Sequence, residues 1–242
     1  MRPFAAQARA EVLMTLRRGD SVLLALGIPV LLLGFFSLVD VLPEPDGVSD
    51  PVEFLFPGIL ALAVMSTAMV SLAIATGFER QYLVLKRLGS TPLGRPRLLA
   101  AKTTAVLAVE AVQLVVLLVE ARLLGWEGGD IRPVLAIAAV LLATVGFCGI
   151  GLLLAGTLPA LTTLAAANGA YLLLLLLSGM VIPLDRLPGW AQGLGRALPS
   201  GALAELLHAS LRTGDLPARD WLVLALWAVF APAAAALKFR WE

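Results

Sequence analysis

The chain has 242 residues, of which 60% are hydrophobic and only 14% charged, and its net charge is +1. A soluble domain carries about 25% charged residues, whereas the apolar residues here form runs of about 20, the length that crosses a bilayer as a helix. The period-two alternation of a lipid-spanning β-barrel is missing. These features exclude a soluble protein and predict an all-α integral membrane protein.

The first 20 residues predict a short basic amphipathic helix that lies at the membrane interface. Pro29 predicts a kink inside the first span. Pro57 and Pro133 are expected to begin the second and fourth spans, where the missing N–H of proline costs nothing. We expect a single transmembrane domain over residues 1–242, with six transmembrane helices over residues 21–39, 57–78, 103–124, 133–155, 161–182 and 221–237.

The basic residues predict the orientation of the chain. Twelve of the 18 Lys and Arg residues lie in residues 1–20, in the 79–102 loop and in the C-terminal tail, whereas the 40–56 loop has none. Because cytoplasmic loops are enriched in Lys and Arg, we expect a multi-pass protein of the cell membrane with both termini and the 79–102 loop in the cytoplasm. The 183–220 segment is broken by proline and glycine, so we expect it to form short helices on the outer side.

The 79–102 loop, ERQYLVLKRLGSTPLGRPRLLAAK, holds six of the chain's Lys and Arg residues. Glu79 to Leu88 is expected to form a helix that Gly89 ends, with proline breaks beyond it. The distribution of charge between the two sides of a membrane explains the basic residues, but not such a compact structured element. We expect Leu85 and Leu88 to find nothing in this chain to bury against, so a partner protein would cover them.

The same loop is similar to the loop between the second and third spans of ABC-2 type transporter permeases. The matching residues are Glu79, Arg80, Leu85, Arg87, Leu88, Thr91, Pro92, Leu93 and Lys102. Leu83 and Val84 replace the Gly-Thr of the family pattern. A second stretch, residues 177–207, resembles the end of the family's fifth span and its outer helices, through Ser178, Gly179, Pro183, Leu187, Pro188, Trp190 and Pro199.

This resemblance implies a permease without its own ATP site, which works with a cytoplasmic P-loop ATPase that binds ATP and Mg. Two permeases, identical or closely related, and two ATPase subunits would form one exporter. The N-terminal helix would contact the ATPase, and the 183–220 segment would dip back into the outer leaflet. The main ATPase-coupling residues implied by the resemblance are Glu79, Arg80, Leu85, Lys86, Arg87, Leu88, Thr91 and Pro92.

The residues argue against an enzyme. The chain lacks the G-x-x-x-x-G-K-[ST] loop that cradles ATP phosphates. Its single histidine and single cysteine, His208 and Cys148, are too few for a cluster of metal ligands. We expect His208 to be a polar residue at the interface and Cys148 to be a packing residue. The chain is expected to bind no metal, cofactor or nucleic acid, and ATPase activity is expected only in the complex.

Polar residues inside the apolar spans are candidates for the translocation path, because ionisable groups are expensive in a membrane. Glu110, Gln113 and Glu120 share one face of the third span, and Asn168, Tyr171 and Ser178 share one face of the fifth. An interhelical hydrogen bond is the favoured reading of Asn168. Glu110 has no basic residue at similar depth, and both a water-filled dimer cavity and plain packing stay open for it.

The spans are rich in Ala, Leu and Val, which suits a hydrophobic or amphipathic small molecule, such as a drug or a lipid, as the cargo, and suits plain packing between helices equally well. If the cargo is a drug, we expect the protein to take part in efflux and antibiotic resistance. Two other classes stay open. A secondary transporter driven by an ion gradient would show repeated halves and charged residues at broken helices, and a membrane scaffold would transport nothing. An adjacent gene for a P-loop ATPase would discriminate between the three.

Overall fold

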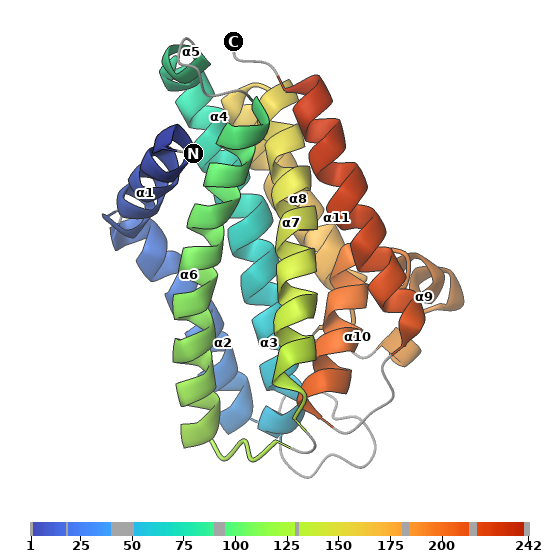
Figure 1. The fold of residues 1–242 in the computed structure, drawn as a ribbon. Coiled ribbons are helices and arrows are strands. Elements are labelled where there is room, and N and C mark those ends of the chain that lie inside the picture. Colours follow the sequence, from blue (N-terminus) through green and yellow to red (C-terminus); the bar gives the residue numbers. More distant parts are fainter. Residues whose placement is uncertain are drawn as a thin grey trace.

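The computed structural model describes residues 2–17, 19–39, 51–89, 95–128, 131–180, 184–212 and 217–239, which form a bundle of helices (Figure 1). No strand occurs in these ranges, so the all-α class is confirmed for them. The elements in chain order are α1 (Arg2–Arg17), α2 (Gly19–Leu38), α3 (Pro51–Met65), the π-helix η1 (Ser66–Ser71), α4 (Leu72–Gln81), α5 (Val84–Gly89), α6 (Arg95–Leu123), α7 (Pro133–Thr157), α8 (Ala160–Leu176), the 3-10 helix η2 (Leu184–Arg186), α9 (Gly189–Gly195), α10 (Pro199–Leu211) and α11 (Ala218–Lys238).

Within the described ranges, four continuous helices are long and apolar enough to cross a membrane. They correspond to the predicted second, third, fourth and sixth spans and run over Pro51–Gln81, Pro96–Leu123, Pro133–Thr157 and Ala218–Lys238. The predicted first and fifth spans fall on shorter apolar helices, Ala25–Leu38 and Ala160–Leu176. The membrane-protein class is therefore supported, and a crossing by all six helices stays a prediction.

The expectation that Pro57 begins the second span is wrong, because α3 begins at Pro51 and includes Pro57 in its interior. Glu53 lies in the first turn of α3, where the helix dipole favours a negative charge. The helix that contains the predicted third span begins before that span, since α6 already includes the basic residues from Arg95 onward. Pro133 does begin α7, as expected.

The predicted helix over Glu79 to Leu88 is divided in the structure. α4 ends at Gln81, and α5 begins only after a turn in which Leu83 has a φ of 60°. This left-handed conformation strains a residue with a Cβ and interrupts the helix. α5 ends at Gly89, as predicted. Thr91 and Pro92 lie outside the described residues.

The helix formed by α3, η1 and α4 is the centre of the bundle. Within its most apolar stretch 72% of the residues are buried, against 22% for α11. In Figure 1, α6 and α7 stand side by side in front of α3, with α8 behind and α11 beside α7. Glycines on α7 allow close contact: a Cβ on Gly149 would lie 2.4 Å from the backbone nitrogen of Pro232 in α11, and one on Gly151 would lie 2.6 Å from the carbonyl oxygen of Met69 in η1.

The segment between α8 and α11 forms the short elements η2, α9 and α10, in agreement with the short helices predicted there. α8 ends at Leu176, before the predicted end of the fifth span. Gly179, with a φ of 75°, lies in the turn that follows. A Cβ on Gly195 would lie 2.2 Å from the carbonyl oxygen of Leu177, so glycine allows α9 to pack directly on the end of α8. Whether these helices enter the outer leaflet stays a prediction.

Candidate functional site

Three helices meet at a buried lysine near one end of the bundle. Nζ of Lys102 in α6 lies 2.5 Å from Oε2 of Glu79 in α4 and 3.4 Å from Oε2 of Glu11 in α1. Lys102 is only 2% exposed. Removing one member of a buried ion pair leaves an uncompensated charge and costs about 3–5 kcal/mol. We call Glu11, Glu79 and Lys102 the ionic triad, and it holds α1, α4 and α6 together.

Sequence reasoning singled out Glu79 and Lys102 but missed Glu11. Glu11 is 6% exposed and also accepts a hydrogen bond of 2.9 Å from Nε2 of Gln7. The only signal for it was an acidic residue within an otherwise basic amphipathic segment. That signal does not reveal which cation the carboxylate meets, because its partner is 91 residues away.

The neighbouring Arg80 connects α4 to the junction of α7 and α8. Its Nη1 donates a hydrogen bond of 2.8 Å to the carbonyl of Ala155, and its Nη2 donates one of 3.0 Å to the carbonyl of Leu158. The last carbonyls of a helix have no partner within the helix and favour a positive charge. Arg80 therefore caps the C-terminal end of α7.

The turn between α4 and α5 exposes three apolar residues: Tyr82 is 69% exposed, Leu83 51% and Val84 42%. Leu85 is completely buried within the chain's own core. The expectation that Leu85 needs a partner protein for its burial is therefore wrong, because the side chain already belongs to the chain's core and α5 packs on α4. Lys86 is exposed, and the side chains of Arg87 and Leu88 lie outside the described ones. Tyr82, Leu83 and Val84 are called the exposed turn below.

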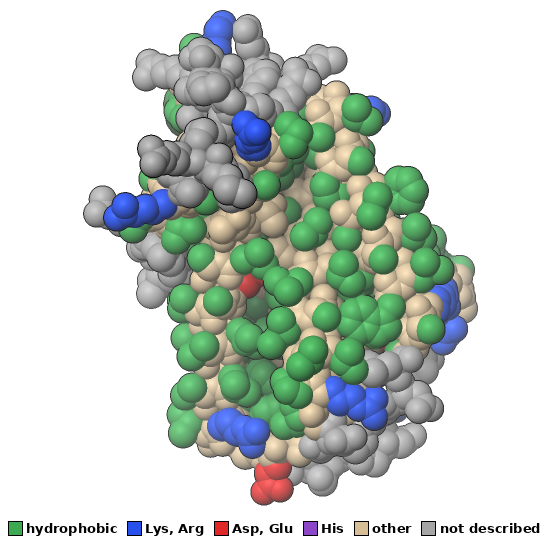
Figure 2. Space-filling view, in the orientation of Figure 1, with side chains coloured by type: hydrophobic (Ala, Val, Ile, Leu, Met, Phe, Trp, Pro, Cys, Tyr) green, Lys and Arg blue, Asp and Glu red, His purple; other side chains and the backbone are tan. Residues whose placement is uncertain are grey.

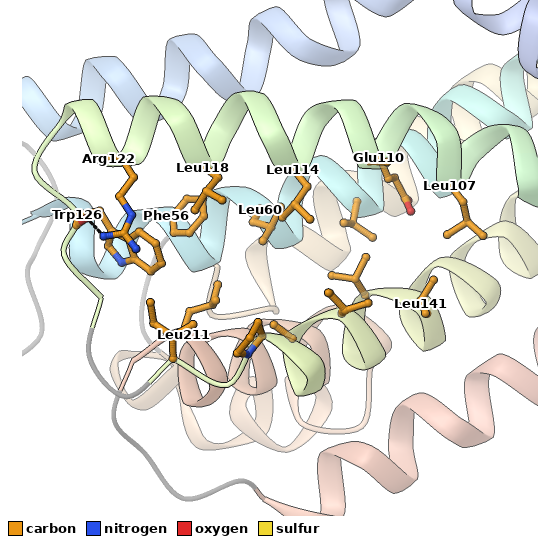
Figure 3. A pocket seen from close by; sticks show the side chains of 17 residues that line it. Phe56, Leu60, Leu107, Glu110, Leu114, Leu118, Arg122, Trp126, Leu141 and Leu211 are labelled. Carbon is orange, nitrogen blue, oxygen red and sulfur yellow. Dashed lines mark hydrogen bonds between the residues drawn. The ribbon is translucent and has the colours of Figure 1, made fainter.

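A groove of about 480 Å³ lies between α3, α6 and α7 (Figure 3). Its lining is almost entirely apolar and consists of Phe56, Leu60, Val64, Leu107, Glu110, Ala111, Leu114, Leu118, Arg122, Trp126, Ile131, Pro133, Ala136, Ile137, Val140, Leu141 and Leu211. The carboxyl group of Glu110 points from α6 toward α7, and Arg122 lies near the other end of the groove.

Glu110 is 5% exposed, and the partner of its carboxyl group is a hydroxyl group and not a cation. Its Oε2 accepts a hydrogen bond of 2.6 Å from Oγ1 of Thr144 in α7. Its Oε1 has no hydrogen-bond partner among the described residues. The same Thr144 hydroxyl lies 2.8 Å from the carbonyl of Val140, so its single proton is shared between two acceptors.

The other two polar candidates of the third span face a different neighbour. Nε2 of Gln113 lies 2.8 Å from the carbonyl of Ala25 in α2 and 2.9 Å from Oγ1 of Thr67 in η1. Oε1 of Glu120 lies against α2, where a Cβ on Gly34 would approach it to 3.2 Å. Gln113 and Glu120 therefore contact α2, whereas Glu110 contacts α7, so the structure does not bring these three candidates together.

The candidates of the fifth span are also separate. Asn168 is exposed, and its Nδ2 donates to the carbonyl of Leu164 in its own helix. Among the described residues this bond within the helix replaces the interhelical hydrogen bond that was expected. Tyr171 is half-buried against the core. Ser178 donates to the carbonyl of Leu175 and accepts from the N–H of Met180. These bonds stabilise the turn after α8.

His208 in α10 is not the interfacial polar residue expected from the sequence. Its ring stacks on Phe54 of α3, with centroids 4.8 Å apart and an interplanar angle of 18°. Neither ring nitrogen has a hydrogen-bond partner among the described residues. Burial, with the positive charge of Arg212, lowers the pKa of His208 to about 3, which keeps the imidazole neutral at physiological pH.

A comparison with protein families gives a match that covers the sites described above. The family described as ABC-2 type transporter matches residues 3–211, a range that includes the ionic triad, the exposed turn and the groove. A search of curated proteins gave no match. Because the family match extends over most of the 242 residues, the chain belongs to the ABC-2 type transporter family, whose members are permease components of ABC transporters.

Proposed function

We propose that this chain is the membrane subunit of an exporter driven by ATP hydrolysis in a separate ABC ATPase subunit. Membership of the ABC-2 family implies such a partner, and the chain has no P-loop of its own. The observation that carries the proposal is the exposed turn. Its three apolar side chains come just after Glu79 and Arg80, through which α4 contacts α6 and the end of α7.

These connections supply a mechanical path. A force on the exposed turn reaches α7 through Arg80, and it reaches α6 and α1 through Glu79 and Lys102. α4 continues directly into η1 in the middle of the central helix. A π-helical turn inside a helix frequently occurs at a functional site. Movement of the ATPase would thus reach the centre of the membrane domain through contiguous helices.

The assembly and orientation belong to the same proposal. The end of the bundle that carries α5 also carries the end of α11 (Figure 1). The excess of Lys and Arg in these segments supports a cytoplasmic location for this end. Two ATPase subunits and a second permease, identical or related, would complete the transporter in the cell membrane. The cargo would be a hydrophobic or amphipathic small molecule, as in drug efflux and antibiotic resistance, because the helices are mainly aliphatic. The ion-gradient alternative gains no support from the family match.

Docking at the exposed turn can be tested with Leu83→Asp combined with Val84→Asp. Both side chains are exposed, and aspartate tolerates the positive φ at position 83 better than leucine does, so the bundle should stay folded. The variant is co-expressed with the ABC ATPase encoded nearest to its gene. We expect the ratio of ATPase to permease after purification to fall at least about tenfold, because charged groups would replace apolar contacts of about 2 kcal/mol or more.

The matched control is Leu123→Asp, which places an aspartate at a residue that is 83% exposed at the other end of α6. It should retain the wild-type ratio. A double variant that also retains the wild-type ratio, with a folded permease, would show that the exposed turn does not dock the ATPase.

A further inference from the structure

The groove between α6 and α7 combines an apolar lining with one deeply placed carboxyl group. Figure 2 shows a hollow on this face of the molecule, bordered by hydrophobic side chains, with an acidic side chain at its upper end. The volume of about 480 Å³ lies within the range of small-molecule sites. Nothing in the proposed coupling path uses this groove, since the ionic triad and Arg80 lie nearer to the end of the bundle that carries α5.

The hydrogen bonding of Glu110 is incomplete in the chain alone. Oε2 accepts a hydrogen bond from Thr144, whose proton is shared with the carbonyl of Val140, and Oε1 accepts none from the described residues. A buried polar group without a partner is unfavourable, and a carboxyl group inside a membrane is more so. A ligand that donates hydrogen bonds, and carries a positive charge, would complete the site.

The other charged group of the groove does not compete for this role. Arg122 lies 12 residues beyond Glu110, or about 18 Å along the helix. Its Nη1 donates to the carbonyls of Trp126 and Glu127, and its guanidinium lies 4.7 Å from the centre of the Trp126 ring. Arg122 is therefore directed to its own chain, which favours a cationic ligand at Glu110 over an anionic lipid at Arg122.

We propose that the groove binds an amphipathic amine, whose ammonium group donates hydrogen bonds to Glu110 and whose apolar body lies along α6 and α7. Leu114 and Leu118 of α6, with Ile137 of α7, would contact this body. Binding is a property of this chain and is measured without an ATPase. Only the further step, that such amines are cargo of the transporter, rests on the proposed function. Amine binding can therefore fail while the proposed function holds, and the reverse.

The experiment uses full-length protein in nanodiscs of phosphatidylcholine at pH 7. The probe is dodecylamine with a diazirine at the end of its alkyl chain, which crosslinks to its binding site on illumination. The competitors are unlabelled dodecylamine, dodecanol and dodecanoate. They are chosen because they share a chain length and differ only in the head group. We expect crosslinks in the parts of α6 and α7 that line the groove, and we expect the amine to compete at least about tenfold better than the alcohol, as for a hydrogen-bonded charged pair.

Glu110→Gln should reduce competition by the amine to the level of the alcohol and leave the alcohol unchanged. Glu120→Gln is the matched control, since it makes the same substitution on the same helix but against α2, and it should keep the wild-type preference. Ala111→Phe, at an exposed position that lines the groove, should weaken the amine and the alcohol alike. It keeps the test valid even if Glu110→Gln fails to fold.

Three results would overturn the proposal. The first is equal competition by amine and alcohol in the wild-type protein. The second is crosslinking that lies outside the groove or survives both Glu110→Gln and Ala111→Phe. The third is a preference for dodecanoate that Arg122→Gln removes, which would identify an anion site at the other end.

Discussion

Lys102 and Glu110 lie eight residues apart on α6, about 12 Å along the helix, and both are almost completely buried. Lys102 meets two carboxylates from two other helices. Glu110 meets one hydroxyl, and its second oxygen has no partner among the described residues. A charge with all its partners in place stabilises one arrangement of helices, whereas an incompletely paired charge beside a groove is suited to binding something else. The same helix thus carries a structural ion pair at Lys102 and a candidate ligand-binding group at Glu110.

Disruption of the ionic triad should have the largest effect on stability. Lys102→Met leaves Glu79 and Glu11 without their buried cation, so it should lower the free energy of unfolding by about 3–5 kcal/mol. Thermal unfolding of the purified protein measures this loss. Lys238→Met, at an exposed position at the end of α11, should change stability by less than about 0.5 kcal/mol. Equal effects of the two variants would show that the ionic triad does not stabilise the packing of the three helices.

Arg80 should have the next largest effect. Arg80→Gln removes the charged hydrogen bonds to Ala155 and Leu158, which should cost about 2–3 kcal/mol. Arg80→Lys keeps the charge near the end of α7 and should restore part of this stability, although a single ammonium group does not reproduce the guanidinium fork. Identical melting temperatures for the two variants would contradict a capping role.

His208 extends the comparison to a half-buried side chain whose two ring nitrogens are buried and which stays uncharged. Its pKa of about 3 in the folded chain lies below that of an unfolded histidine, about 6.5. Between these values the unfolded chain binds more protons, so stability should be complete above pH 6.5 and fall by up to about 1.4 kcal/mol per pH unit below it.

His208→Phe keeps an aromatic ring against Phe54 but removes the titration. Its stability should therefore depend less steeply on pH between about 6.5 and 4 than that of the wild-type protein. Thermal unfolding at a series of pH values measures both slopes. Parallel slopes would mean that His208 is protonated in the folded state.

Glu110→Gln should have the smallest effect on stability, within about 0.5 kcal/mol of the wild-type value or slightly stabilising. The amide can still accept the hydrogen bond from Thr144, and it removes a carboxyl group from an apolar environment. The measurement is the same thermal unfolding, with Lys102→Met as the contrasting variant. A loss as large as that of Lys102→Met would make Glu110 a structural residue and remove the contrast between the two levels of α6.

Sequence reasoning succeeded where a local rule decides the structure. Long apolar runs identify the membrane helices, Pro133 begins α7 and Gly89 ends α5. The loop motif identified the family. The same local rules failed at Pro57, because a proline inside an apolar run is indistinguishable from one that begins a helix when the residues before it are also compatible with helix. Leu85 shows the same limitation: a leucine in a basic loop gives no indication that its side chain is buried in the chain's own core.

The sequence by itself determined the class of protein, the approximate places of its helices and the family, because these depend on the length of apolar runs and on contiguous motifs. The tertiary structure alone decided which neighbour each polar residue meets. Helical periodicity places Glu110, Gln113 and Glu120 on one broad face of α6, but this face borders α2 on one side and α7 on the other. The ionic triad likewise depends on residues from three helices. Such partners are set by how helices pack, which no local pattern specifies.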